Sequence, residues 1–252
     1  MELESVGPLG KDVIYVALDF PDADRAVDMA KLLKGEVGGF KVGMELYTAI
    51  GPDILKALRD EGVGDVFLDL KFHDIPATVK GAAKSAVRAG AQLFNVHCPG
   101  TTAMMKAAVE GAREQAQADG WTRMPEVIGV TLLTSINDEA LKEELGVEKE
   151  RQDYVVGLAR LAQDAGLDGV VCSAQEVEAI SIVCGSDFLT VVPGIRLAGA
   201  DKQDQQRTGT PGWARKAGAR RLVIGRPITQ AEDPVAAARA HAADWDAAGL
   251  AG

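Results

Sequence analysis

Short apolar runs and helical stretches alternate eight times along this chain of 252 residues. The apolar runs have the length of buried strands, and the segments between them carry the apolar spacing of amphipathic helices. Eight such units in about 230 residues are typical of an α/β fold, the closed (β/α)8 or TIM barrel. We expect strands at residues 13–18, 39–42, 66–72, 91–96, 126–132, 169–172, 188–192 and 221–224.

A doubly wound open sheet is the alternative arrangement. It would be expected to carry a G-x-G-x-x-G turn after the first strand, and the sequence ALDFPDADR at 17–25 contains none. Asp22 is instead expected to cap the helix that follows. Because we find no linker rich in Pro, Gly or Ser, we expect a single domain over residues 1–252. Its barrel core should span about 12–247, after an irregular segment at 1–11.

Composition restricts the possible partners. The formal net charge of −10 argues against a general binder of nucleic acid or of acidic membranes, so an anionic ligand would need a local basic site. The three cysteines have no C-x-x-C spacing, which argues against a disulfide framework or a structural zinc site. No apolar run approaches the roughly 18 residues of a membrane span, and the first residues are acidic, unlike a signal peptide. We expect a cytoplasmic location.

One predicted strand, within VFLDLKFHDIP at 66–76, carries charge where a buried strand should have none. Its alternation places Asp69 and Lys71 on one face and apolar side chains on the other. A half-exposed strand could hold them as a solvated ion pair. In a parallel sheet covered by helices both faces are buried, so the two charges must be paired or functional. Asp74 follows, at the strand end where barrels place their active sites.

Other polar residues are predicted at the same rim. Asp19 and Lys41 follow or end the first two strands, although Asp19 could be a helix cap and Lys41 could extend to solvent. The motifs VPGIR at 192–196 and IGRPI at 224–228 each place a glycine beside an arginine after the last two strands, where barrels often bind phosphate. The polar loop at 197–209 between them is a candidate lid.

Taken in order, these motifs resemble the orotidine 5′-phosphate decarboxylase family over nearly the full length of the chain. The matching segments are ALDF at 17–20, FKVG at 40–43, DLKFHDIPATV at 69–79, NVH at 95–97, TLLTS at 131–135, VPGIR at 192–196, DQQR at 204–207 and IGRPI at 224–228. The resemblance implies the final step of de novo pyrimidine nucleotide biosynthesis, in which orotidine 5′-phosphate loses CO2 to give UMP. It also implies that neither a metal nor an organic cofactor is used.

The resemblance further implies roles for individual residues. Lys71 would donate a proton to C6 of the pyrimidine, within a catalytic array of alternating charge. That array would comprise Lys41, Asp69, Lys71 and Asp74, with Asp74 supplied by the partner subunit of a homodimer. Ile75 and Thr78 would also reach the partner's site, Asp19 and Lys41 would hold the ribose, and Thr134 the pyrimidine edge. The remaining substrate-binding residues would be Pro193 and, at the phosphate, Arg196, Gln205, Gly225 and Arg226.

Two other functions remain open at this point. A metal-dependent keto-sugar phosphate decarboxylase or hexulose phosphate synthase shares the charged strand motif but places a magnesium-binding glutamate on the second strand. This chain has Lys41 there, and Glu45 is expected in the following loop or helix. A non-catalytic barrel that binds phosphorylated nucleosides is the other alternative. His241, on the final helix, is expected to be exposed.

Overall fold

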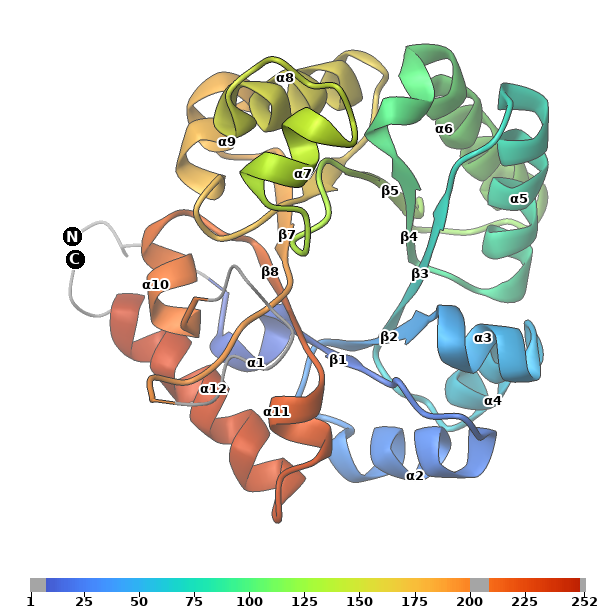
Figure 1. Ribbon diagram of the computed structural model, residues 1–252. Helices are drawn as coiled ribbons and strands as arrows, with labels where there is room; N and C mark the ends of the chain where they lie inside the picture. The colour runs from blue at the N-terminus through green and yellow to red at the C-terminus, as the bar shows by residue number, and fades with distance from the viewer. Residues whose placement is uncertain (1–7, 200–208, 250–252) are drawn as a thin grey trace, which may run out of the picture.

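The computed structural model describes residues 8–199 and 209–249. Its eight parallel strands pair in sequence order and close into a barrel, because β1 pairs with both β2 and β8 (Figure 1). The (β/α)8 prediction is confirmed. The strands are β1 (Ile14–Ala17), β2 (Gly39–Gly43), β3 (Asp65–Phe72), β4 (Leu93–His97), β5 (Glu126–Val130), β6 (Gly169–Val171), β7 (Leu189–Val192) and β8 (Arg221–Ile224).

Helices form the outer ring around this barrel (Figure 1). Asp22 caps α2 as predicted, because its carboxylate accepts a hydrogen bond from the backbone N–H of Arg25 at 2.9 Å. The helices are α1 (Gly10–Val13), α2 (Ala23–Leu33), α3 (Met44–Ile50), α4 (Asp53–Asp60), α5 (Pro76–Ala89), α6 (Thr101–Ala118), α7 (Asp138–Glu143), α8 (Arg151–Asp164), α9 (Val177–Cys184), α10 (Pro211–Lys216), α11 (Arg226–Thr229) and α12 (Pro234–Gly249), with a 3₁₀ turn at Cys98–Gly100.

The short helix α1 replaces part of the segment expected to be irregular. It is held by tertiary contacts that no local pattern could reveal. The backbone N–H of Gly10 donates to the carboxylate of Asp246 at 2.7 Å, and a side chain at position 10 would collide with the backbone of Ala242. The segment that precedes β1 thus packs against α12.

Apolar side chains form two layers, one inside the barrel and one between its strands and the surrounding helices. One cluster lies inside the barrel and includes Tyr15, Phe67, Leu93 and Val223. A larger cluster lies between the strands and the helices. The amino-terminal end of the barrel is tied by ion pairs, such as that between Arg221 and Glu126. In barrels of this kind the active site lies at the other end, at the carboxyl termini of the strands.

His241 corrects one expectation. Its side chain is buried, with only 2% of the residue exposed, because α12 turns it toward the protein interior. Its Nδ1 lies 2.8 Å from the carbonyl oxygen of Ala237. Burial lowers the pKa of His241, an effect to which Arg196 adds, while the Ala237 carbonyl and Asp244 oppose it.

The buried histidine predicts loss of stability in acid. Because the pKa of His241 is lower in the folded protein than in the unfolded chain, stability is complete above the unfolded value and falls as the pH drops below it. His241→Gln should therefore remove on the order of 1 kcal/mol of the acid destabilisation. The measurement is urea unfolding from about pH 8 to about pH 5, the range in which histidine titrates.

The comparison variant is His73→Gln, because His73 is exposed; its ring lies 5.5 Å from that of His97, so this variant should remove only acid sensitivity that arises through His97. The pKa of His97 is also lowered, chiefly by burial. Both variants should therefore retain part of the acid sensitivity of wild-type stability. Equal pH dependence of unfolding in wild type and His241→Gln would contradict the prediction.

Candidate active site

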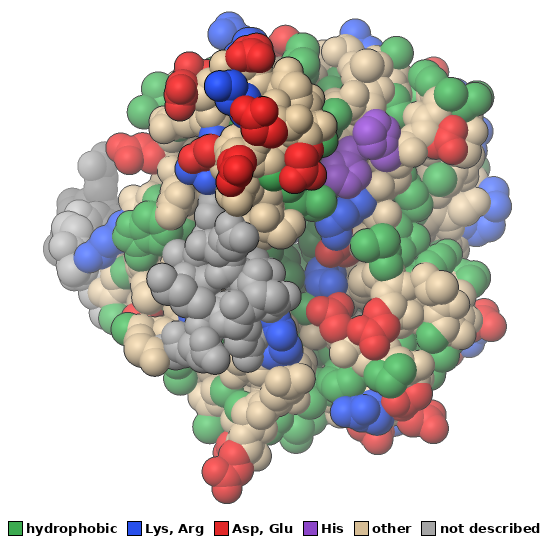
Figure 2. Space-filling view, in the orientation of Figure 1, with side chains coloured by type: hydrophobic (Ala, Val, Ile, Leu, Met, Phe, Trp, Pro, Cys, Tyr) green, Lys and Arg blue, Asp and Glu red, His purple; other side chains and the backbone are tan. Residues whose placement is uncertain are grey.

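A cavity of about 660 Å³ opens at the carboxyl ends of the strands. Side chains of both charge signs gather around the hollow at the centre of this face (Figure 2). The charged residues that line it come from six places in the chain. They are Asp19 after β1, Lys41 on β2, Glu45 on α3, Asp69 and Lys71 on β3, Arg196 after β7, and Arg226 after β8.

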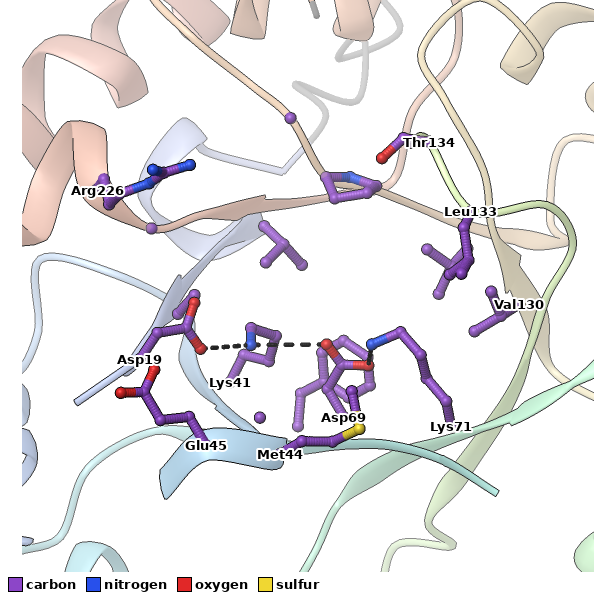
Figure 3. Close-up of a pocket in the computed structure, with 18 of the residues that line it drawn as sticks. Asp19, Lys41, Met44, Glu45, Asp69, Lys71, Val130, Leu133, Thr134 and Arg226 are labelled. Carbon is purple, nitrogen blue, oxygen red and sulfur yellow. Dashed lines mark hydrogen bonds and ion pairs between the residues drawn. The ribbon is translucent and has the colours of Figure 1, made fainter. Parts of the chain in front are cut away.

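Four of these side chains form a continuous row along one wall (Figure 3). The Lys41 ammonium lies 3.0 Å from Oδ1 of Asp19 and 3.6 Å from Oδ2 of Asp69. The Lys71 ammonium lies 2.6 Å from Oδ1 of Asp69. Charges of alternating sign therefore run from β1 to β3, and Asp69 and Lys71 form an ion pair, one of the two arrangements that the sequence left open.

Burial strengthens the two ion pairs of Asp69, whereas Asp19, at the outer end of the row, is 52% exposed. The side chains of Lys41, Asp69 and Lys71 are 10%, 13% and 23% exposed, so little water screens them. Burial alone would raise the pKa of Asp69. The positive charges of Lys41 and Lys71, with hydrogen bonds from Lys71 and Asn95, outweigh burial and lower that pKa. Asp69 is therefore a fixed negative charge between two ammonium groups.

The glycine of the FKVG segment has a steric role. A side chain at Gly43 would lie 2.7 Å from the Lys41 ammonium and 3.1 Å from the Asp19 carboxylate. The glycine thus leaves room for the ion pair between these two residues, which explains why Lys41 turns into the cavity instead of reaching solvent.

The opposite wall carries the glycine–arginine motifs. Arg226 and Thr134 lie across the cavity from the charged row in Figure 3. Arg196 is buried, and its Nη1 donates to the carbonyl oxygen of Ile195 at 2.9 Å. Pro193 and Gly225 also line the cavity. Gln205, and most of the predicted lid at 197–209, lie outside the described residues.

Three predicted residues do not line this cavity. Asp74, Ile75 and Thr78 follow β3 on the exterior of the chain, and Ile75 is 66% exposed. The Asp74 carboxylate accepts a hydrogen bond from the backbone N–H of Ile75 at 2.6 Å. The structure of one chain therefore separates Asp74 from the row formed by Asp19, Lys41, Asp69 and Lys71.

Sequence reasoning missed several cavity residues, and it assigned no role to Asn95. Asn95 lies on β4 and contacts Asp69, although the only signal was a polar residue within an apolar strand. Glu45 lies on α3, one of the two locations expected for it, yet it also lines the cavity. Met44, Leu133 and Gln230 complete the rim without any sequence signal.

Residues 8–199 and 209–249 contain neither a cluster of metal-ligating side chains nor a membrane-spanning helix. Within these residues, no three His, Cys, Asp or Glu side chains are grouped so that they could hold a metal ion. In the same part of the chain, no helix is both long enough and apolar enough to cross a membrane.

The closed parallel barrel and the charged cavity at its carboxyl end define the class of (β/α)8 barrel enzymes. A family profile narrows the class, because the profile of the orotidine 5′-phosphate decarboxylase / HUMPS family matches residues 12–241. The chain belongs to this family.

Individual relatives agree with this assignment. The orotidine 5′-phosphate decarboxylase of Moorella thermoacetica is 50% identical over 93% of this chain and 92% of its own length. That of Nitratidesulfovibrio vulgaris is 51% identical over 93% of this chain and 97% of its own. The crystal structure of orotidine 5′-phosphate decarboxylase from Lactobacillus acidophilus, 38% identical, superposes with a TM-score of 0.80 and covers 92% of this chain and 98% of that one.

Proposed function

We propose that this protein decarboxylates orotidine 5′-phosphate to UMP and CO2, without a cofactor, as the final step of pyrimidine nucleotide synthesis. The observation that carries the proposal is the charged row Asp19–Lys41–Asp69–Lys71 along one wall of the cavity, in which Lys41 and Asp69 are largely buried. The names of relatives at about half identity support the same reaction.

Lys71 is the proposed proton donor. Loss of CO2 leaves an electron pair at C6 of the pyrimidine, with no adjacent carbonyl group to accept it. A fixed ammonium beside C6 stabilises this carbanion-like state and then donates the proton that replaces CO2. Asp69, 2.6 Å from the Lys71 ammonium, holds that group in place. The charges of the protein thus stabilise the carbanion-like state, which a cofactor does in other decarboxylases.

The remaining cavity residues are proposed to bind the nucleotide. Asp19 and Lys41, which form an ion pair, would hold the ribose hydroxyls, and Thr134 the pyrimidine edge. The phosphate would lie on the opposite wall. Its proposed contacts are Pro193, Arg196, Gly225 and Arg226, together with Gln205 from the predicted lid.

Replacing Arg226 with alanine should lower kcat/KM by about 10²-fold, because a charge-assisted contact to the phosphate is lost. The reduction should exceed the loss of UMP affinity in calorimetry, since phosphate binding energy also contributes at the reacting carbon. Arg220→Ala is the matched control, because Arg220 is an exposed arginine just before β8, at the other end of the barrel. An unchanged kcat/KM for Arg226→Ala would exclude the phosphate role.

A homodimer is proposed to complete the site. Asp74, Ile75 and Thr78 are exposed just beyond the carboxyl end of β3, the end at which the cavity opens. In a two-fold dimer each of these residues would reach the partner's cavity, and Asp74 would extend the alternating charges beyond Lys71. The cytoplasmic location stays a prediction.

The family also includes enzymes outside nucleotide metabolism, so the keto-sugar phosphate alternative needs a physical test. The Lys41 ammonium, which contacts Asp19 and Asp69, would repel a divalent cation at the position of the magnesium ligand. The test is the loss of orotidine 5′-phosphate absorbance in EDTA. Wild type should be fully active and Lys71→Ala inactive.

Two other results of this assay would each favour a different function. Loss of activity in EDTA that magnesium restores would favour the keto-sugar phosphate enzymes. Binding of UMP without any release of CO2 would favour the non-catalytic barrel.

A further inference from the structure

The backbone at Lys71 has an unusual conformation. Its φ angle is +54°, in the left-handed region that is unfavourable for a residue with a side chain. The pairing of β3 with β4 is irregular at the same place, because Leu68 pairs with Phe94 but Phe72 pairs with Val96. Lys71 therefore lies in a bulge, where no regular backbone ladder fixes its position.

The side chain of Asn95 replaces the missing ladder contact. The backbone N–H of Lys71 donates to Oδ1 of Asn95 at 2.8 Å. Through its other polar atom, Nδ2, Asn95 donates to Oδ1 of Asp69 at 2.7 Å. One amide thus binds the backbone of one member of the ion pair and the carboxylate of the other.

The amide also holds the plane of the Asp69 carboxylate between the two lysines. Oδ1 of Asp69 accepts from Asn95 and from the Lys71 ammonium, which leaves Oδ2 toward Lys41 at 3.6 Å. A partial rotation of the carboxylate out of this plane would break the contact with Asn95. Asn95 itself is only 1% exposed and is not among the residues that line the cavity. It can act on the reaction only through Asp69 and Lys71.

We infer that Asn95 is a positioning residue, which fixes the strained backbone of Lys71 and the carboxylate of Asp69 in the geometry needed for proton donation. This inference rests on the proposed decarboxylase function and adds a residue to it. Asparagine suits the role because its amide carries both an acceptor and a donor. Alanine removes both contacts, whereas aspartate keeps the acceptor and gains the donor only when it is protonated.

The first test is steady-state kinetics of Asn95→Ala. We expect kcat to fall by about 10²-fold, as for a displacement of about 1 Å at the reacting groups, while KM changes less than about threefold. Asn137→Ala is the matched control, because Asn137 is exposed and caps α7 far from β4 in sequence. A wild-type kcat in a folded Asn95→Ala protein would overturn the inference.

The second test uses Asn95→Asp, which has nearly the same shape. The groups facing Asp69 are Lys41 from β2, Lys71 from β3 and, farther along β4, His97. Two ionised carboxylates beside each other would repel, whereas a shared proton would restore a donor to Asp69. We expect kcat of Asn95→Asp, relative to wild type, to rise at least about tenfold between about pH 8 and about pH 5.5.

The two tests separate the possible failures. A pH profile of Asn95→Asp parallel to that of wild type would overturn the positioning role, even if Asn95→Ala fails to fold. An inactive wild type would instead overturn the decarboxylase proposal, and a fully active Lys71→Ala would overturn the role of Lys71. Asn137→Asp should keep the wild-type profile, and UMP binding verifies that each variant is folded.

Discussion

Replacing Lys71 with alanine is expected to lower kcat for orotidine 5′-phosphate by about 10⁵-fold, because electrostatic stabilisation and proton donation are lost together. UMP binding should change only a few-fold, since the proposed phosphate and ribose contacts come from other residues. The Lys71 side chain is only 23% exposed, so little water screens its charge, and that charge acts strongly on a bound substrate.

Single-turnover kinetics and UMP titration measure the two effects separately. Lys56→Ala is the matched control: Lys56 also pairs with an aspartate, Asp60 at 2.5 Å, but on the exposed surface of α4. It should retain wild-type kcat. A Lys71→Ala protein within about tenfold of wild type would show that Lys71 is not the proton donor. Equal losses of kcat and UMP affinity would indicate a binding role only.

Much of the fold could be predicted because its signals are local. Residues 221–224 form β8 with the predicted bounds, and β7 at Leu189–Val192 lies within the predicted 188–192, since each segment is apolar in its own sequence. The charged wall could also be predicted. Charges such as Asp69 and Lys71 within an apolar strand have no stable place except in a paired or functional arrangement.

The features that could not be predicted depend on contacts between distant segments. The left-handed backbone of Lys71 depends on the amide of Asn95, which is 24 positions away in the chain. The burial of His241 depends on the packing of α12, and α1 depends on Asp246. In each case the local sequence permits several conformations, and a tertiary contact selects one.

The prediction of a shared site starts from the position of Asp74. On its own chain Asp74 is exposed, and its carboxylate accepts a hydrogen bond from the neighbouring backbone N–H of Ile75. Ile75 presents a large apolar side chain, 66% exposed, beside it. An acid next to an exposed apolar residue at the mouth of a cavity fits a site completed by a second subunit.

Mixed dimers provide the sharpest test. A subunit carrying Lys71→Ala, combined with one carrying Asp74→Ala, should form one site with both defects and one intact site. Dimers purified through a different tag on each subunit should then recover about half of wild-type activity, as two-fold symmetry requires. Each parent variant alone should retain less than about 1%, because each lacks part of the electrostatic array.

A second pair of variants controls for subunit exchange itself. Arg226 and Lys71 line the cavity of the same chain, so mixing Lys71→Ala with Arg226→Ala should give no gain over the parents. If Asp74 acts within its own chain, the first pair should behave like this control and remain inactive. Recovery in the first pair alone would therefore place Asp74 in the site of the partner subunit, and the alternating charges of one cavity would belong to two chains.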